Sequence, residues 1–511
     1  MRNRITARMA CALVFVAAGM WSSASQAEGP ENGRPVGTHV GGIASVHYSP
    51  DGQYLASGGG DKKIRVWEAR TGRLVHEWDG PSSFTCAVRF SPDGNLVAAA
   101  GYESGSAHPT HVYDRGTGKP RTQLKSPTAG GIRRLVFSPD GKSLISAGFD
   151  GHLRVWDLST MKEIVAIKVE AGSLYDLALS PDGRMVATAG RDGLRLWDLS
   201  TGREQPRDEM KKHGCITVAY SPDGKLLASG DQNSVKIWEV MTGKEVVELT
   251  GFRGEVSQLL FSGDSRRLYS SSYDRMVRLW NVLDGEMLGE IEAHSGWVWG
   301  IALNKGETKM ASCSVDTKLL VWDLGRSFRS AGGSSKKLTP GQLESHCTHL
   351  ASPDAPTAYQ AIRALTQDPD QSLPAIRKRL LAPQPSSGGT VGENIGQCIR
   401  DLDADSYSVR EEATARLARM GVSALPSLEK ALAHSPSLEA RKRLRRLVSR
   451  LDPTELASEE LMTLRSVQAL EYMATPEARR LLEQLSGSRG NPLASGQAVQ
   501  ALNRIRDRAD R

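Results

Sequence analysis

The sequence predicts an all-β domain built from a repeated antiparallel sheet, followed by an all-α domain. Two observations lead to this prediction. A unit that ends in tryptophan recurs through residues 33–324, and apolar residues in the remainder follow the roughly 3.6-residue spacing of helices. The unit is most regular in residues 294–323, where short apolar runs alternate with glycine, asparagine and aspartate turn signals. Such runs are typical of successive strands in one sheet.

The first and last units carry four residues with polar groups at the same spacing. An indole N–H only donates and a carboxylate only accepts, whereas an imidazole and a hydroxyl can bridge between them. We therefore expect a half-buried network that links the loop before the sheet, the second strand, the turn and the third strand. Its members are His39, Ser57, Asp61 and Trp67 in the first unit and His294, Ser312, Asp316 and Trp322 in the last. A structural role is favoured over catalysis, because the set recurs at fixed positions and tryptophan has no part in acyl transfer.

The final tryptophan of the unit recurs with a regular period. From Trp67 to Trp322 the steps are 46, 43, 41, 41, 42 and 42 residues, with Tyr113 in place of tryptophan in the second unit. The turn tetrapeptide SPDG keeps the same period, and SGDS replaces it in the sixth unit. These residues resemble the WD-repeat (WD40) family, whose repeats of about 40–45 residues each supply four strands. The resemblance covers about residues 33–324 and implies an all-β seven-bladed β-propeller within residues 28–324.

Two places in this domain need comment. The second unit carries an insertion, ESGSAHPTH, so its blade edge is expected to be irregular. The last unit lacks a fourth strand, and alignment of the repeats places Asn32–Gly37 in that position. We therefore predict that the N-terminus closes the ring, with Pro35 in an outer strand that tolerates the loss of one N–H. Ser327–Ser330 is the alternative closing strand.

Residues 1–27 have the features of a signal peptide. Arg2, Arg4 and Arg8 precede an apolar stretch over residues 10–21, and Ser25-Gln26-Ala27 forms a small-x-small cleavage site. That stretch is shorter than the roughly 20 residues that span a bilayer. We expect an exported protein, periplasmic or extracellular, that begins at Glu28. Loss of the leader reduces the formal charge from +7 to +4, which is too little to predict nucleic-acid binding.

The cysteines that follow the leader do not form a disulfide framework. Cys86, Cys215 and Cys313 lie within or beside strands and are expected to pack as small apolar residues. Cys347 and Cys398 either pair with each other or remain free.

A Gly/Ser/Lys-rich linker, residues 325–339, leads to the all-α region over residues 340–511. The pair VREEATARLARMG and ALPSLEKALA resembles a HEAT-type helical hairpin, which implies a HEAT-like helical-repeat domain. One helix in this region is strongly basic over Arg441–Arg450. Either it binds an acidic protein or an anionic lipid, or it is a solvated face neutralised by nearby acids, which is the favoured interpretation. The candidate acids are Glu429, Glu439 and Asp452.

The sequence contains no motif for haem attachment, phosphate-loop binding, zinc proteolysis or a nucleophilic serine. The segment His346-Cys347-Thr348-His349 lacks a partner pair at zinc spacing and is interpreted as part of a helix surface. No catalytic residue, cofactor or metal is therefore predicted.

The expected function is that of a non-enzymatic scaffold whose propeller face binds a peptide or protein. The alternative is a ligand-binding sensor or an enzyme that uses the central channel. The WD-repeat resemblance implies binding loops around the channel rim, where Trp297 is expected to have Glu255 and Gly42 as neighbours. The candidate binding residues lie near the start of the first strand of their units, and are Trp297, Phe84, Arg134, Asp176, Glu255 and Gln258.

Overall fold

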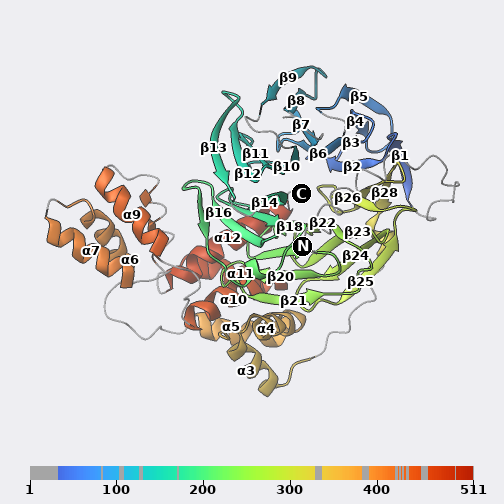
Figure 1. Cartoon of the computed structure of the whole chain (residues 1–511). Coiled ribbons are helices and arrows are strands. Elements are labelled where there is room, and N and C mark those ends of the chain that lie inside the picture. Colours follow the sequence, from blue (N-terminus) through green and yellow to red (C-terminus); the bar gives the residue numbers. More distant parts are fainter. Residues whose placement is uncertain are drawn as a thin grey trace, which may run out of the picture. The chain divides into compact units, whose positions relative to one another are not determined.

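The computed structural model describes most of the chain. The described residues are 33–81, 84–102, 109–125, 131–169, 172–328, 337–381, 391–404, 406–419, 437–450, 458–488 and 491–509, with a few positions between 424 and 432. Contacts divide the chain into two compact units, the first made of β-strands and the second mainly of α-helices (Figure 1). The predicted signal peptide lies outside the described residues.

Seven four-stranded antiparallel sheets follow one another along the chain and are numbered as blades 1 to 7. Blade 1 comprises β2 (Ile43–Tyr48), β3 (Tyr54–Gly59), β4 (Lys63–Glu68) and β5 (Leu74–Asp79). Blade 2 comprises β6 (Phe84–Phe90), β7 (Leu96–Tyr102), β8 (Thr110–Asp114) and β9 (Pro120–Leu124). Blade 3 comprises β10 (Ile132–Phe137), β11 (Ser143–Gly148), β12 (His152–Asp157) and β13 (Lys162–Lys168). Blade 4 comprises β14 (Leu174–Leu179), β15 (Met185–Gly190), β16 (Gly193–Asp198) and β17 (Arg203–Gln205).

The remaining blades have the same order. Blade 5 comprises β18 (Thr217–Tyr220), β19 (Leu226–Gly230), β20 (Val235–Glu239) and β21 (Glu245–Leu249). Blade 6 comprises β22 (Val256–Phe261), β23 (Arg267–Ser272), β24 (Met276–Asn281) and β25 (Met287–Glu292). Blade 7 comprises β26 (Val298–Leu303), β27 (Lys309–Ser314), β28 (Lys318–Asp323) and, from the other end of the chain, β1 (Arg34–Thr38).

The first strand of each blade lies innermost. Each of these strands contacts the first strand of the next blade, and β26 of blade 7 contacts β2 of blade 1, so the series closes. The predicted seven-bladed β-propeller is therefore confirmed. The insertion expected to disturb blade 2 lies largely outside the described residues.

The N-terminal strand closes the ring, as predicted. Strand β1 pairs antiparallel with β28, from Arg34 opposite Val321 to Thr38 opposite Lys318 (Figure 1). Glycines make the close approach possible: a Cβ on Gly37 would lie 2.6 Å from the ring of Trp67. The alternative segment does not supply this strand, because Ser327 ends the short helix α2 (Leu324–Ser327) and residues 329–330 lie outside the described part.

The second unit is helical, so the predicted all-α region is confirmed. Apolar residues at three- and four-residue steps form buried stripes, for example Ala358, Ile362 and Leu365 in α4. Ser437 caps α9 by accepting from the N–H of Ala440 at 3.0 Å. The HEAT-like pairing stays a prediction, because much of its second helix lies outside the described residues. The helices are α3 (Pro340–His349), α4 (Ala355–Gln367), α5 (Pro369–Leu380), α6 (Val391–Asp401), α7 (Tyr407–Arg419), α9 (Leu438–Arg450), α10 (Ser458–Met473), α11 (Pro476–Ser486) and α12 (Pro492–Ala509).

None of the described helices is both long and apolar enough to cross a membrane. All five cysteines of the described residues have free thiols, so Cys347 and Cys398 do not pair. Both are buried, Cys347 on α3 and Cys398 in the apolar cluster that α6 forms with α7 and α9. Burial raises the pKa of the Cys347 thiol.

Removal of residues 28–38 tests the closure. This deletion takes away β1 and exposes the backbone edge of β28, so we expect a clearly lower melting temperature and concentration-dependent aggregation. Differential scanning fluorimetry and light scattering measure the two effects. Removal of residues 28–32 is the control, because it leaves β1 intact and should melt like the full-length mature chain. A normal melt of the longer deletion as a monomer would contradict closure by β1.

Candidate functional site

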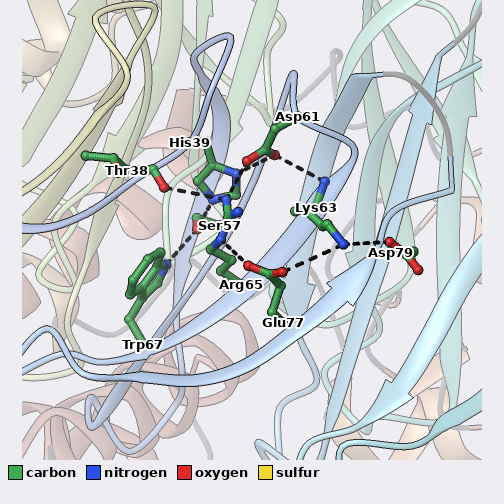
Figure 2. A network of polar contacts seen from close by, with 9 residues as sticks. All are labelled: Thr38, His39, Ser57, Asp61, Lys63, Arg65, Trp67, Glu77 and Asp79. Atoms are coloured by element: carbon green, nitrogen blue, oxygen red, sulfur yellow. Dashed lines mark hydrogen bonds and ion pairs between the residues drawn. The ribbon is translucent and has the colours of Figure 1, made fainter.

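The four polar landmarks of blade 1 form one hydrogen-bonded chain (Figure 2). The indole N–H of Trp67 donates to Ser57 Oγ at 2.8 Å, and Ser57 Oγ lies 2.8 Å from His39 Nε2. His39 Nδ1 lies 2.8 Å from Asp61 Oδ1. Because the indole can only donate, the hydroxyl of Ser57 donates to Nε2, and Nδ1–H donates to the carboxylate. Blade 7 repeats this chain with His294, Ser312, Asp316 and Trp322.

Burial explains the charge states in this network. It lowers the pKa of His39 below its ordinary value of 6.5, which keeps the ring neutral at pH 7. Burial also raises the pKa of Asp61, but hydrogen bonds from His39 and Arg65 lower it by more, so the carboxylate stays charged. Ser57 is 0% exposed and His39 is 1% exposed. A substrate carbonyl therefore has no access to the serine, although the order of groups is that of a hydrolase triad.

Replacement of Asp61 by alanine should destabilise the protein. It leaves the buried Nδ1–H of His39 unpaired, which costs about 1–3 kcal/mol of unfolding free energy. Urea unfolding of the mature chain measures this loss. Asp79→Ala is the matched control from the same blade, because the Asp79 side chain is 89% exposed in its ion pair with Lys63. Equal stability of the two variants would show that the network does not hold the blade.

A backbone irregularity near the start of the inner strands creates a second candidate site. In β2, β6, β10, β14, β22 and β26 the pairing with the second strand skips one residue at the second or third position. Such a bulge breaks the two-residue alternation and redirects a side chain. Arg133, Tyr175 and Trp299 occupy the skipped position in blades 3, 4 and 7.

These residues and their neighbours form a half-buried cluster at the N-terminal ends of the inner strands, which we call the mouth. Trp297 stacks on Tyr273, with ring centroids 4.9 Å apart and planes inclined by 10°. Trp299 meets Phe84 edge to face at 5.4 Å. The members of the mouth are Phe84, Arg133, Tyr175, Glu255, Tyr273, Trp297 and Trp299.

The mouth also holds opposite charges. The guanidinium of Arg133 lies 5.9 Å from the Tyr175 ring centre, and its Nε donates to the carbonyl of Tyr175 at 2.9 Å. Burial raises the pKa of Glu255, against the effects of Arg133 and of a hydrogen bond with Tyr273. Burial raises the pKa of Tyr273 to about 12, so its hydroxyl stays protonated and can donate. The mouth therefore combines aromatic rings, a cation and an acid at the N-terminal ends of the inner strands.

Below the mouth, an arginine crosses the channel. Arg134 of blade 3 donates from Nε to Asp176 of blade 4 at 2.9 Å, and its Nη2 reaches the carbonyl of Ser257 in blade 6 at 3.4 Å. Asp176 in turn accepts from Thr217 Oγ1 of blade 5 at 2.7 Å. Gln258 accepts from the N–H of Ile301 in blade 7 at 3.1 Å. These side chains link blades to one another and occupy the channel at this level.

The structure thus divides the six predicted binding residues into two groups. Trp297, Phe84 and Glu255 lie in the mouth, whereas Arg134, Asp176 and Gln258 lie in the blade-to-blade contacts below it. The ring that lies closest to Gly42 is that of Trp299, 3.1 Å from the position of an added Cβ, and the expected proximity of Gly42 to Trp297 stays a prediction. Sequence reasoning missed Arg133 and Tyr175, because strand alternation turns them away from the chosen neighbours Arg134 and Asp176. It also missed Trp299, which lies at the bulge of blade 7.

A metal site and a binding role for the basic helix α9 receive less support from the structure. The described residues contain no group of three His, Cys, Asp or Glu side chains able to hold a metal ion. On the basic helix α9, Arg443 pairs with Glu411 at 2.6 Å and with the expected Glu439 at 2.9 Å. This pairing supports a solvated, internally neutralised face. The other two acids proposed, Glu429 and Asp452, lie outside the described residues.

A family model described as WD domain, G-beta repeat matches seven stretches of the chain. They are residues 33–68, 72–108, 118–157, 164–198, 204–239, 243–281 and 285–323, just over half of the sequence. Each begins near the outer strand of one blade, and all but the second, which stops at residue 108 before β8, end with the third strand of the next blade. This is the repeat period inferred from the tryptophans.

Curated proteins similar to this chain include Protein HIR1 of Chaetomium globosum, 29% identical over 175 residues that cover 29% of this chain and 16% of that protein. Eukaryotic translation initiation factor 3 subunit I of Scheffersomyces stipitis is 30% identical over 166 residues, 30% of this chain and 45% of that protein. WD repeat-containing protein SL1-17 of Schistosoma mansoni is 28% identical over 151 residues, 30% of this chain and 48% of that protein. The chain spans less than half of the length of each of these relatives.

Proposed function

Because the chain belongs to the WD40 (WD domain, G-beta repeat) family, we propose that it is a non-enzymatic interaction protein whose channel mouth binds a peptide or protein segment. The observation that carries this proposal is the mouth itself. Its aromatic rings are half-buried, so they are held in place and still present area to a partner. Aromatic and arginine side chains of this kind dominate the binding energy of protein interfaces.

The chemistry of the mouth favours a partner segment with an apolar side chain next to a polar one. Trp297 and Tyr273 present a stacked aromatic pair, while Glu255 and Arg133 provide an acid and a cation. The alternative of a small ligand deep in the channel is disfavoured, because Arg134 and Asp176 fill that space. The name of one relative, subunit I of an initiation factor, describes a component of an assembly and supports protein binding.

We further propose that the partner is met outside the cytoplasm. The basic and apolar leader and its small-x-small site support export, with Glu28 as the first mature residue. N-terminal sequencing of protein isolated from the native host should find Glu28 at the start. An intact Met1 on protein from the cytosolic fraction would contradict export.

Replacement of Trp297 by alanine tests the mouth. The mature protein is used as bait on host fractions, the captured partner is identified by mass spectrometry, and its affinity is measured with purified components. Loss of a central aromatic contact should raise the Kd of that partner at least tenfold, about 1.4 kcal/mol or more. The melting temperature should change little, because the loss of one half-exposed aromatic pair costs only about 1 kcal/mol.

Met287→Ala is the matched control. Met287 is an exposed apolar residue, 47% exposed, on β25 away from the inner strands. This variant should capture the partner like the wild type. If Trp297→Ala melts much lower yet binds the partner normally, Trp297 is a packing residue and the mouth is not the binding site.

A further inference from the structure

A cavity of about 450 Å³ lies between blades 7 and 1, at the C-terminal ends of β26 and β2. The mouth lies at the N-terminal ends of the same strands, so the cavity is at the opposite end of the propeller. Four cationic side chains line it: Arg34 from β1, Arg70 from the turn after β4, Lys309 from β27 and Arg326 from α2. One carboxylate, Asp323, lines it as well. We call this space the seam cavity.

The tetrapeptide turns explain why the space occurs at this junction. At the four junctions from blade 1 to blade 5, the proline of one turn packs against the glycine of the next: a Cβ on Gly94 would lie 3.4 Å from Pro50, and one on Gly183 would lie 3.2 Å from Pro139. In blade 7 the turn reads NKGE and has no proline. The atom closest to a Cβ on Gly52 is therefore Cβ of Asn304, at 3.8 Å.

The positive charge of the seam cavity is only partly compensated. Asp323 pairs with Lys309 at 2.7 Å, and its other oxygen accepts from the N–H of Arg326 at 3.3 Å as the cap of α2. The carboxylate is thereby fully engaged. Within the described residues, no carboxylate lies within ion-pair distance of the guanidinium groups of Arg34, Arg70 and Arg326, although Arg70 interacts electrostatically with Glu68 and Arg326 with Asp323. Arg34 also donates to the carbonyl of Ala69. Arg70 and Arg326 are exposed and free to turn toward a ligand.

The lining also includes a buried hydroxyl. Ser327 lines the seam cavity, and its Oγ is buried without a hydrogen-bond partner among the described residues. A buried hydroxyl without a partner costs free energy, so such groups normally have one. The Ser327 Oγ atom is closed to solvent, so a ligand oxygen would reach it only after the Ser327 side chain turned toward the cavity.

We propose that the seam cavity binds a small organic phosphate ester. A phosphate carries close to two negative charges and three acceptor oxygens, and guanidinium groups bind such oxygens through two parallel N–H donors. The volume lies within the range of about 300–1,000 Å³ typical of small-molecule sites, which is more than an inorganic ion fills. Val321 and Tyr48 in the lining provide contact for the organic part.

Isothermal titration calorimetry of the mature chain, at constant ionic strength, tests this proposal with three probes: inorganic phosphate, glucose 6-phosphate and glucose. We expect saturable one-to-one binding of inorganic phosphate, at least tenfold tighter binding of glucose 6-phosphate, and no binding of glucose. Absence of saturable phosphate binding up to about 50 mM would overturn the proposal. Equal affinity for inorganic phosphate and glucose 6-phosphate would overturn the proposal that the site recognises an organic ester, and would show a site for an inorganic anion.

Variants locate the binding. The double variant Arg70→Ala/Arg326→Ala should raise the Kd for glucose 6-phosphate at least tenfold without unfolding the protein, because both side chains are exposed. Arg73→Ala is the matched control from the same turn: Arg73 pairs with Glu68 and does not line the cavity, so the Kd should change less than twofold. Unchanged affinity in the double variant would place any phosphate elsewhere and overturn the assignment.

Discussion

Closure of the ring by β1 is the interaction on which the rest of this propeller depends. Without it, β28 would present a row of unpaired backbone groups, which is an aggregation hazard. The closing strand comes from the far end of the chain, so its fit cannot be adjusted by a short loop. Gly33 and Gly37 make the fit possible, because a Cβ on either would collide with a tryptophan ring, Trp322 or Trp67 respectively. The glycines are thus required by the same tryptophans that mark the repeat.

The interaction that recurs in most blades is one hydrogen bond of the four-residue network, the bond from the tryptophan N–H to a hydroxyl. The tryptophan N–H donates to a second-strand hydroxyl even where the histidine is missing, as from Trp156 to Ser146 at 3.0 Å and from Trp197 to Thr188 at 2.9 Å. In blade 2 the hydroxyl of Tyr113 donates instead to the carbonyl of Asp79 in blade 1, at 2.7 Å. The indole–hydroxyl hydrogen bond therefore links the third strand to the second. In blades 1 and 7, the histidine and the aspartate extend this link to the preceding loop and to the turn between the two strands.

Sequence reasoning reached the period, the blade number and the closing strand, because these follow from residues that repeat in register. It also selected Trp297, Phe84 and Glu255, since they lie near the start of the first strand of their units. It could not place Arg133, Tyr175 and Trp299. A bulge depends on the pairing of two strands, and regular alternation predicts the opposite face for the residue at the skipped position. Apolar spacing likewise predicted helices in the C-terminal region, but amphipathic spacing does not specify a partner helix, and the HEAT-like pairing rests on resemblance alone.

The junction between blades 7 and 1 differs from the others for a reason that lies in the chain itself. Along the repeats, each turn packs against the turn that follows it in sequence, and proline against glycine serves most of these contacts. Blade 7 has no following turn in sequence: its neighbour is the turn of blade 1, and its proline position holds Lys305. Relief from that packing opens space, and the closing strand brings Arg34 to its edge. The closure that removes an edge thereby also adds a cationic side chain, Arg34, to the cavity at this junction.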